Sequence, residues 1–177
     1  MDDLGRDSVD GFRAKKKFPI AVVLDNVRSL NNIGSIFRSS DAFCVERICL
    51  CGITATPPSV EIHKTALGAE DSVEWKYFET TADALAELRA EGWTLCAVEQ
   101  ADDSVSLESF RPAADAKYAV VLGHEVYGVE QSVVDACDLT LEIPQFGTKH
   151  SLNVAVTAGI LLWQLAKNYF PSKNVEN

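Results

Sequence analysis

The sequence predicts an α/β fold in which a mostly parallel sheet is covered by helices on both faces. Short β-branched runs alternate along the chain with segments of helical period, which is typical of this class. Several of the runs are apolar on both faces, as in buried parallel strands. With 177 residues, 47% of them hydrophobic, the chain is long enough for one core and short for two, so we expect a single domain over residues 1–177.

Six runs predict strands. In chain order they are IAVVLD (20–25), RICLCG (47–52), VEWKYF (73–78), TLCAVE (94–99), YAVVLG (118–123) and LTLEIP (139–144). Four segments between or after them predict helices: NNIGSIFRSSDAFCV (31–45), TTADALAELRAEG (80–92), EQSVVDAC (130–137) and a last helix over about 151–169. The second of these helices begins at a threonine, carries an Ala/Leu stripe and stops at Gly92. Residues 1–18 form a short basic N-terminal arm, either ordered or frayed.

The composition indicates in which compartment the protein acts and whether it binds a metal. No segment reaches the roughly 18 to 20 uninterrupted apolar residues of a membrane span, and the N-terminus lacks the apolar core of a signal peptide. We therefore expect a cytoplasmic protein with no membrane partner. Five cysteines without a Cys-x-x-Cys pair predict reduced, buried thiols, and three scattered histidines add nothing to a metal site, so no metal is expected.

The net charge of −10 is unevenly distributed along the chain. Residues 69–142 hold 17 Asp and Glu against 4 Lys and Arg, whereas the segments on either side are close to neutral. A polyanion can therefore meet a neutral-to-basic face built from the two ends of the chain, where phosphate contacts act locally.

Ligands of α/β sheets gather outside the carboxyl ends of the strands, and three stretches fall there. In the first, Asn31-Asn32-Ile33-Gly34 predicts a turn into a helix, with Arg38 one turn beyond Gly34 on the same face. The glycine permits close backbone approach, and the guanidinium suits a phosphate. An asparagine cap followed by an exposed arginine explains the pattern equally well.

The second stretch, VVLGHEVYGV, leaves a strand at Leu122-Gly123 and continues to Gly128. Beyond the end of the strand, its backbone groups are no longer held in the sheet and are suited to bind a ligand beside Glu125. Taken alone, Glu125 is more simply explained as a loop or capping carboxylate.

The third stretch, IPQFGTKHSLNVAVTAGILLW (143–163), begins as a polar loop and becomes an almost unbroken apolar run. Ser151 fits the N-cap of the last helix, but capping leaves Asn153 unexplained. A buried amide without partners costs about 1–3 kcal/mol, so a neighbouring loop or a ligand must supply them. Ala155, Ala158 and Gly159 form a small-residue surface that lets another backbone come close.

The three stretches together resemble the motifs of the SPOUT superfamily, specifically the SpoU/TrmH-type RNA ribose 2'-O-methyltransferases. The motifs here are NNIGSIFRSSDAFCVERI, VVLGHEVYGV and LEIPQFGTKHSLNVAVTAGILLWQL, and the resemblance covers nearly all of 20–168. Their order and spacing make it specific. HKTALGAEDSVEW and AVEQ look like the branch that includes tRNA guanosine ribose methylases.

The resemblance implies a Rossmann-like sheet with a C-terminal trefoil knot, S-adenosylmethionine as cofactor, and a homodimer in which the first-motif arginine completes the partner's site. The positions that match the cofactor cradle are Leu122, Gly123, Glu125, Gly128, Ile143, Gln145, Ser151, Leu152 and Asn153. The catalytic positions are Asn32, Arg38, Glu125, Ser151 and Asn153. His124 stands where the family more often has asparagine, which puts the hydrogen bonding of that loop in doubt.

The expected substrate is RNA, with tRNA favoured over rRNA. A guanidinium stays protonated, so we interpret Arg38 as a phosphate anchor and a stabiliser of alkoxide charge rather than as a base. We expect no separate N-terminal RNA-binding domain, so RNA recognition is expected to rest on the basic arm and on five side chains: Arg28, Arg38, Lys64, Lys149 and His150. Lys149 and His150 are equally explained as ordinary loop charges.

Three other functions stay open on the sequence. A dinucleotide-dependent dehydrogenase is disfavoured because DNVRSLNNIG, and not a G-x-G-x-x-G turn, follows the first strand. A catalytically inactive, knotted RNA-binding module fits the fold, although a pure binder would not need the five catalytic positions together. A small-molecule methylase is disfavoured by Arg38, which suits a phosphate.

Overall fold

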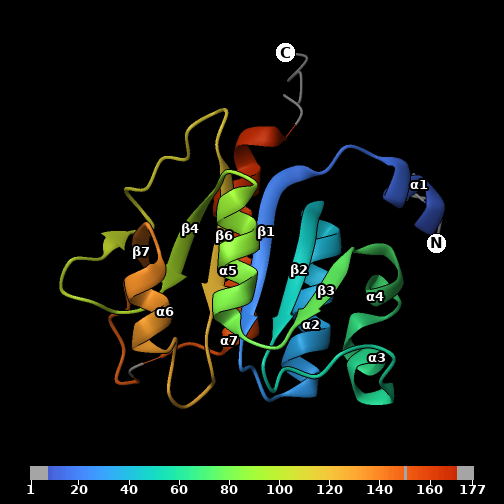
Figure 1. The fold of residues 1–177 in the computed structure, drawn as a ribbon, viewed down its shortest axis with the longest axis horizontal. Helices are drawn as coiled ribbons and strands as arrows, with labels where there is room; N and C mark the ends of the chain where they lie inside the picture. Colours follow the sequence, from blue (N-terminus) through green and yellow to red (C-terminus); the bar gives the residue numbers. More distant parts are fainter. Residues whose placement is uncertain (1–7, 150, 171–177) are drawn as a thin grey trace.

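The computed structural model describes residues 8–149 and 151–170 and contains a seven-stranded sheet with helices on both faces (Figure 1). The strands are β1 (Phe18–Asp25), β2 (Val45–Cys51), β3 (Trp75–Phe78), β4 (Trp93–Val98), β5 (Val105–Ser106), β6 (Lys117–Leu122) and β7 (Leu139–Glu142). Their order is β3-β2-β1-β6-β4-β7-β5, and every neighbouring pair is parallel. The predicted α/β class and all six predicted strands are confirmed, and β5 is additional. The predicted trefoil knot is not fixed by strand order and stays a prediction.

All four predicted helices are present, with shorter bounds. The helices are α1 (Val9–Ala14), α2 (Leu30–Ala42), α3 (Val60–Ala66), α4 (Ala69–Ser72), α5 (Thr81–Ala90), α6 (Gln131–Ala136) and α7 (Val154–Ala166), and a 3₁₀ turn (Lys167–Tyr169) follows α7. The helices α1, α3 and α4 were not predicted. Within the two described ranges, no helix combines the length and the apolar character that a bilayer crossing requires.

The central strand β1 separates two cores. Ile20, Val22 and Leu24 face the core that α2 and α7 cover, whereas Ala21 and Val23 face the core under α5 and α6. Figure 1 shows the two helix layers on opposite faces of the sheet. Successive side chains of a strand point to opposite faces, so burial of both sets explains why the run IAVVLD has no polar alternation.

The start of α2 differs from the sequence prediction. Ser29, and not an asparagine, caps the helix, because its Oγ accepts a hydrogen bond from the N–H of Asn32 (3.3 Å). Gly34 does not lie open to a ligand. A Cβ at Gly34 would lie 2.1 Å from Thr65 Oγ1 and 2.3 Å from the carbonyl oxygen of Ile62. The glycine therefore permits close packing of α2 against α3.

The described part of the N-terminal arm is ordered. Residues 9–14 form α1, which Ser8 caps. The side chain of Arg13 donates to the carbonyl oxygen of Asp71 in α4, and the Lys17 ammonium donates to the carbonyl oxygen of Phe12. Arg13 thereby ties the arm to the rest of the domain, whereas Lys17 makes its contact within the arm.

The five cysteines are free thiols, as predicted. Four of them are buried, and Cys137 is half-buried. Desolvation raises the pKa of Cys49 and Cys51 to about 12 and that of Cys137 to about 11. Neutral thiols with such pKa values are poor nucleophiles and poor metal ligands at neutral pH.

Candidate active site

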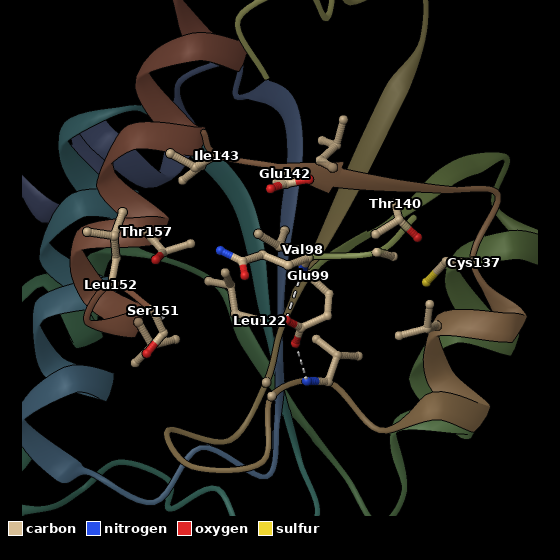
Figure 2. Close-up of a pocket in the computed structure, with 18 of the residues that line it drawn as sticks. Val98, Glu99, Leu122, Cys137, Thr140, Glu142, Ile143, Ser151, Leu152 and Thr157 are labelled. Carbon is tan, nitrogen blue, oxygen red and sulfur yellow. Dashed lines mark hydrogen bonds between the residues drawn. The ribbon is translucent and has the colours of Figure 1, made fainter. Parts of the chain in front are cut away.

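A cavity opens at the carboxyl ends of β4, β6 and β7, beside the start of α7 (Figure 2). Its volume is about 1150 Å³, which is ample for a nucleoside-sized ligand. All nine positions predicted for the cofactor line this cavity: Leu122, Gly123, Glu125, Gly128, Ile143, Gln145, Ser151, Leu152 and Asn153. The second and third motifs therefore meet at the edge where open α/β sheets bind ligands.

The cavity lining is acidic. Among the described residues it contains six carboxylates and neither Lys nor Arg; the carboxylates are Glu99, Asp103, Glu125, Asp135, Asp138 and Glu142. Such a lining disfavours phosphates inside the cavity and favours a ligand that carries positive charge or hydrogen-bond donors. Over 8–149 and 151–170, no three His, Cys, Asp or Glu side chains are placed to share a metal ion.

The loop from Gly123 to Gly128 is closed on itself. His124 and Gly128 exchange two backbone hydrogen bonds of 3.0 and 2.9 Å. A Cβ at Gly123 would lie 2.2 Å from the carbonyl carbon and oxygen of Gly128, and Gly128 itself has a φ of +70°. Both positions therefore require glycine. His124 Nδ1 accepts a hydrogen bond from the N–H of Val126 (3.0 Å), so the unusual histidine supplies an acceptor within the loop.

Glu125 ties this loop to the start of α2. Its Oε1 accepts hydrogen bonds from the N–H of Ser29 (2.9 Å) and from Asn32 Nδ2 (3.2 Å), and its Oε2 accepts one from the N–H of Arg28 (3.1 Å). Burial alone raises the pKa of Glu125, but the hydrogen bonds from the backbone of Ser29 and Arg28 outweigh it and hold the pKa below its ordinary value. An ionised carboxylate with three donors favours a positioning role over proton transfer.

Asn153, and not Ser151, caps α7. The Oδ1 of Asn153 accepts hydrogen bonds from the N–H groups of Ala155 (2.9 Å) and Val156 (3.3 Å). Its Nδ2 donates to Asn32 Oδ1 (3.1 Å), so both the oxygen and the nitrogen of this amide have partners. The prediction that Ser151 caps the helix is wrong, because the helix begins two residues later than expected. Hydrogen bonds thus link all three motifs, from Glu125 through Asn32 to Asn153.

Truncating the two candidate caps distinguishes them. Asn153→Ala is expected to lower the free energy of unfolding by about 1 kcal/mol, because the first-turn N–H groups of α7 lose their acceptor. Ser151→Ala is expected to change it by less than about 0.5 kcal/mol, because Ser151 is exposed and lies before the helix. Urea unfolding followed by circular dichroism measures both values. Equal losses in the two variants would contradict the assignment of Asn153 as the cap.

Arg38 lies outside the cavity of its own chain. It projects from the exposed side of α2 and is absent from the cavity lining. The structure therefore brings four of the five predicted catalytic positions together, namely Asn32, Glu125, Ser151 and Asn153, and leaves the fifth on the surface.

The other cations predicted for RNA binding lie in separate places. Arg28 is exposed just before α2, and Lys149 is exposed on the loop that precedes α7. Lys64 forms an ion pair of 2.6 Å with Glu61 on the surface of α3. His150 lies outside the described residues.

Sequence reasoning missed Glu99, which lines the cavity beside the Gly123–Gly128 loop (Figure 2). A signal was present: Glu99 directly follows the apolar run LCAV at the end of β4. A carboxylate at the carboxyl end of a buried parallel strand is placed to meet a ligand.

The fold and the cavity define a Rossmann-like α/β protein with an acidic ligand site at the carboxyl edge of its sheet. The model of the SpoU rRNA Methylase family matches residues 19–163. Because this match covers most of the chain, the protein belongs to the SpoU rRNA methylase family.

Two curated relatives are 23S rRNA (guanosine-2'-O-)-methyltransferases named RlmB. The one from Nitrosomonas europaea is 35% identical over 152 residues, which are 85% of this chain and 56% of the relative. The one from Vibrio vulnificus is 26% identical over 171 residues, which are 96% of this chain and 68% of the relative. This chain thus spans roughly half to two thirds of the length of these relatives.

Solved structures of relatives share the fold. The AdoMet-bound rRNA methyltransferase from Sinorhizobium meliloti superposes with a TM-score of 0.81 at 26% identity, covering 90% of this chain and 61% of that one. The TrmH/SpoU tRNA modifying enzyme from A. aeolicus gives a TM-score of 0.79 at 23% identity, covering 90% and 81%. At that identity, the second likeness concerns the fold alone.

Proposed function

We propose that this protein is an S-adenosylmethionine-dependent methyltransferase that acts on a ribose 2'-hydroxyl of RNA. The observation that carries the proposal is the convergence of all nine cradle positions on one cavity at the carboxyl edge of the sheet. Family membership and the names of the curated relatives support the same activity.

The residues of the cavity fit S-adenosylmethionine. Its sulfonium and ammonium groups carry positive charge, which suits a lining of six carboxylates without Lys or Arg among the described residues. The Sinorhizobium meliloti rRNA methyltransferase, which shares the fold, binds AdoMet in its crystal structure, and this supports the same ligand here. When bound, the cofactor supplies an electrophilic methyl group to an incoming hydroxyl. Gly123 and Gly128 let the loop close on itself and over Glu99 at the cavity wall, because neither carries a side chain.

Alignment is the main task of the polar residues around the cavity. Transfer to a hydroxyl is an in-line displacement, so holding the ribose still supplies much of the acceleration. Glu125 fixes Asn32, and Asn32 fixes Asn153 at the start of α7. We assign Ser151 and Asn153 to the part of the site that holds the ribose of the RNA substrate, because both line the cavity and are exposed. Guanidinium groups are not deprotonated in proteins, so we assign Arg38 as an anchor for the RNA phosphate and not as a base.

Assembly of the site requires a second copy of the chain. Arg38 is outside its own cavity, and α7 presents a partly exposed apolar face. On that face Val156, Ile160 and Trp163 are 50%, 39% and 56% exposed. Gly159 beside them has no atom within 4 Å of its Cβ position. Such a face, with a small residue in its middle, suits close packing against another copy. In that dimer, Arg38 of one copy serves the cavity of the other.

A charge on the α7 face is expected to separate the copies. Ile160→Glu should convert the dimer to a monomer and remove methyl transfer, because a buried, unpaired carboxylate is costly. Val60→Glu is the matched control, since Val60 is 75% exposed on α3, away from this face. Light scattering after size exclusion measures the mass of each variant. A dimer that persists in Ile160→Glu would reject the α7 face as the interface.

The RNA substrate is better assigned to rRNA than to tRNA. The tRNA preference expected from the sequence has no support among the two curated relatives, whose names specify guanosine of 23S rRNA. We therefore place rRNA first and retain guanosine as the favoured nucleoside. The acidic cavity disfavours the RNA backbone inside it, so we assign the phosphates to positions outside it, and the exposed Arg28 and Lys149 are candidate contacts for them.

Transfer of a labelled methyl group tests the activity. The purified protein is incubated with labelled S-adenosylmethionine and with undermodified rRNA or tRNA, and the digested RNA is analysed for 2'-O-methylated nucleosides. We expect label in a ribose-methylated guanosine of rRNA. Label on a base would reject the 2'-O assignment. Cofactor binding without transfer to either RNA, or RNA binding without cofactor binding, would favour the knotted RNA-binding module.

A further inference from the structure

Glu99 occupies a fixed place in the cavity wall. It follows the last residue of β4, and its own N–H donates to the carbonyl oxygen of Leu141 (3.1 Å), which anchors its backbone to β7. Its side chain lines the cavity and is half-buried there. Figure 2 shows it between Val98 and Leu122, with dashed lines for the hydrogen bonds to its carboxylate.

The carboxylate of Glu99 is held by backbone groups alone. Its Oε2 accepts a hydrogen bond from the N–H of Val129 (3.1 Å), and its Oε1 accepts one from the N–H of Gln100 (3.0 Å). A Cβ at Gly128 would lie 2.2 Å from Oε2, so the glycine leaves room for the carboxylate under the loop. Each carboxylate oxygen accepts about two hydrogen bonds, so each retains one acceptor site.

The other engaged carboxylates of the cavity have different partners. Asp138 is paired with the guanidinium of Arg89 (2.9 Å), and Glu142 accepts from the hydroxyl of Ser104 (2.6 Å). Glu125 is directed to the start of α2. Glu99 has neither a cationic nor a side-chain partner in the described structure, so its negative charge and its remaining acceptor sites are available to a ligand.

We propose that Glu99 accepts hydrogen bonds from the ribose hydroxyls of the nucleoside cofactor and thereby selects a ribonucleoside. The inference rests on the proposed function, because it takes the cavity to bind S-adenosylmethionine. Two neighbouring hydroxyl donors match the two oxygens of one carboxylate. An acidic side chain plays this part at a strand end in dinucleotide-binding sheets of the same general architecture. Glu99 is placed likewise, since β4 neighbours β6, which leads into the glycine loop.

The test combines a side-chain change with a ligand change. Wild type and Glu99→Gln are titrated calorimetrically with S-adenosylhomocysteine and with its 2'-deoxy and 3'-deoxy analogues. Wild type is expected to lose roughly tenfold or more in affinity when a hydroxyl is removed, as for a hydrogen bond to a charged group. Glu99→Gln is expected to bind S-adenosylhomocysteine about tenfold more weakly, yet to discriminate little between it and at least one deoxy analogue. Glu108→Gln, an exposed surface change outside the cavity, should behave as wild type.

Each other outcome overturns the inference in a distinguishable way. If Glu99→Gln loses affinity equally for all three ligands, Glu99 only holds the loop through Val129. If wild type binds all three ligands equally, the ribose hydroxyls lie elsewhere, and only this inference fails. If wild type binds none of them, the proposed function fails as well. Circular dichroism and thermal unfolding show whether Glu99→Gln is folded, which is expected because glutamine keeps an acceptor oxygen for Val129.

Discussion

Replacing Arg38 by lysine is expected to remove nearly all methyl transfer while cofactor binding is unchanged. Arg38 lies outside the cavity of its own chain and is assigned to the RNA phosphate of the partner's site, so cofactor affinity is not expected to depend on it. Its planar guanidinium can hold a phosphate through two hydrogen bonds and face developing alkoxide charge, which a lysine ammonium does only as a point charge. Loss of such a donor typically lowers turnover by about 10²–10³-fold.

Single-turnover transfer and calorimetry on the same preparation separate the two effects. Arg111→Lys is the matched control, because the exposed Arg111 donates only to nearby backbone carbonyls. An Arg38→Lys enzyme with near wild-type turnover would show that a positive charge suffices. Loss of cofactor binding together with turnover would instead indicate that Arg38 contacts the cofactor.

Gly123→Ala is expected to weaken cofactor binding by at least about tenfold, since a misplaced loop forfeits several contacts at once. The added Cβ would lie 2.2 Å from backbone atoms of Gly128 and 2.3 Å from the N atom of Val129. Backbone atoms cannot rotate away as the end of a side chain can, so the loop must move. Calorimetric titration with S-adenosylhomocysteine measures the change.

Gly147→Ala is the control for the glycine change itself. Gly147 lies on the neighbouring loop, and its Cβ position meets no atom within 4 Å. The Gly147→Ala variant should bind S-adenosylhomocysteine with wild-type affinity. Wild-type affinity in Gly123→Ala would contradict the assignment of the loop as part of the binding site.

Mixing the two defective variants tests whether the site is shared between copies. A mixed dimer of Arg38→Lys and Gly123→Ala subunits contains one site with an intact cavity and an intact arginine. With random exchange of subunits, activity is expected to return to about a quarter of wild type. The same mixture would stay inactive if each chain used its own Arg38.

The sheet could be predicted from the sequence because its strands are buried on both faces. Runs such as IAVVLD lack polar alternation, and both sets of side chains of β1 reach a core. The short elements gave no such signal. β5 has two residues and α4 has four, too few to show a period. α3 was missed because it has only seven residues and because the residue after its end, the left-handed Leu67, is not a glycine.

The sequence predicted which residues line the candidate site, but not the hydrogen bonds that connect them. The resemblance placed nine positions together, and the cavity contains all nine. Local propensity allows either serine or asparagine as a cap, so the sequence favoured Ser151, whereas the structure places Asn153 at the cap and adds its tertiary contact with Asn32. Gly34 shows the same limit, because the close approach that requires it comes from α3, a helix that the sequence did not reveal.

The most direct test of the central claim is calorimetric titration of the purified protein with S-adenosylmethionine and S-adenosylhomocysteine, with light scattering on the same sample. We expect one site per chain on a dimer, with a dissociation constant in the micromolar range. A folded dimer that binds neither ligand, with or without RNA present, would contradict the assignment of the cavity as a cofactor site and, with it, the proposed methyl transfer.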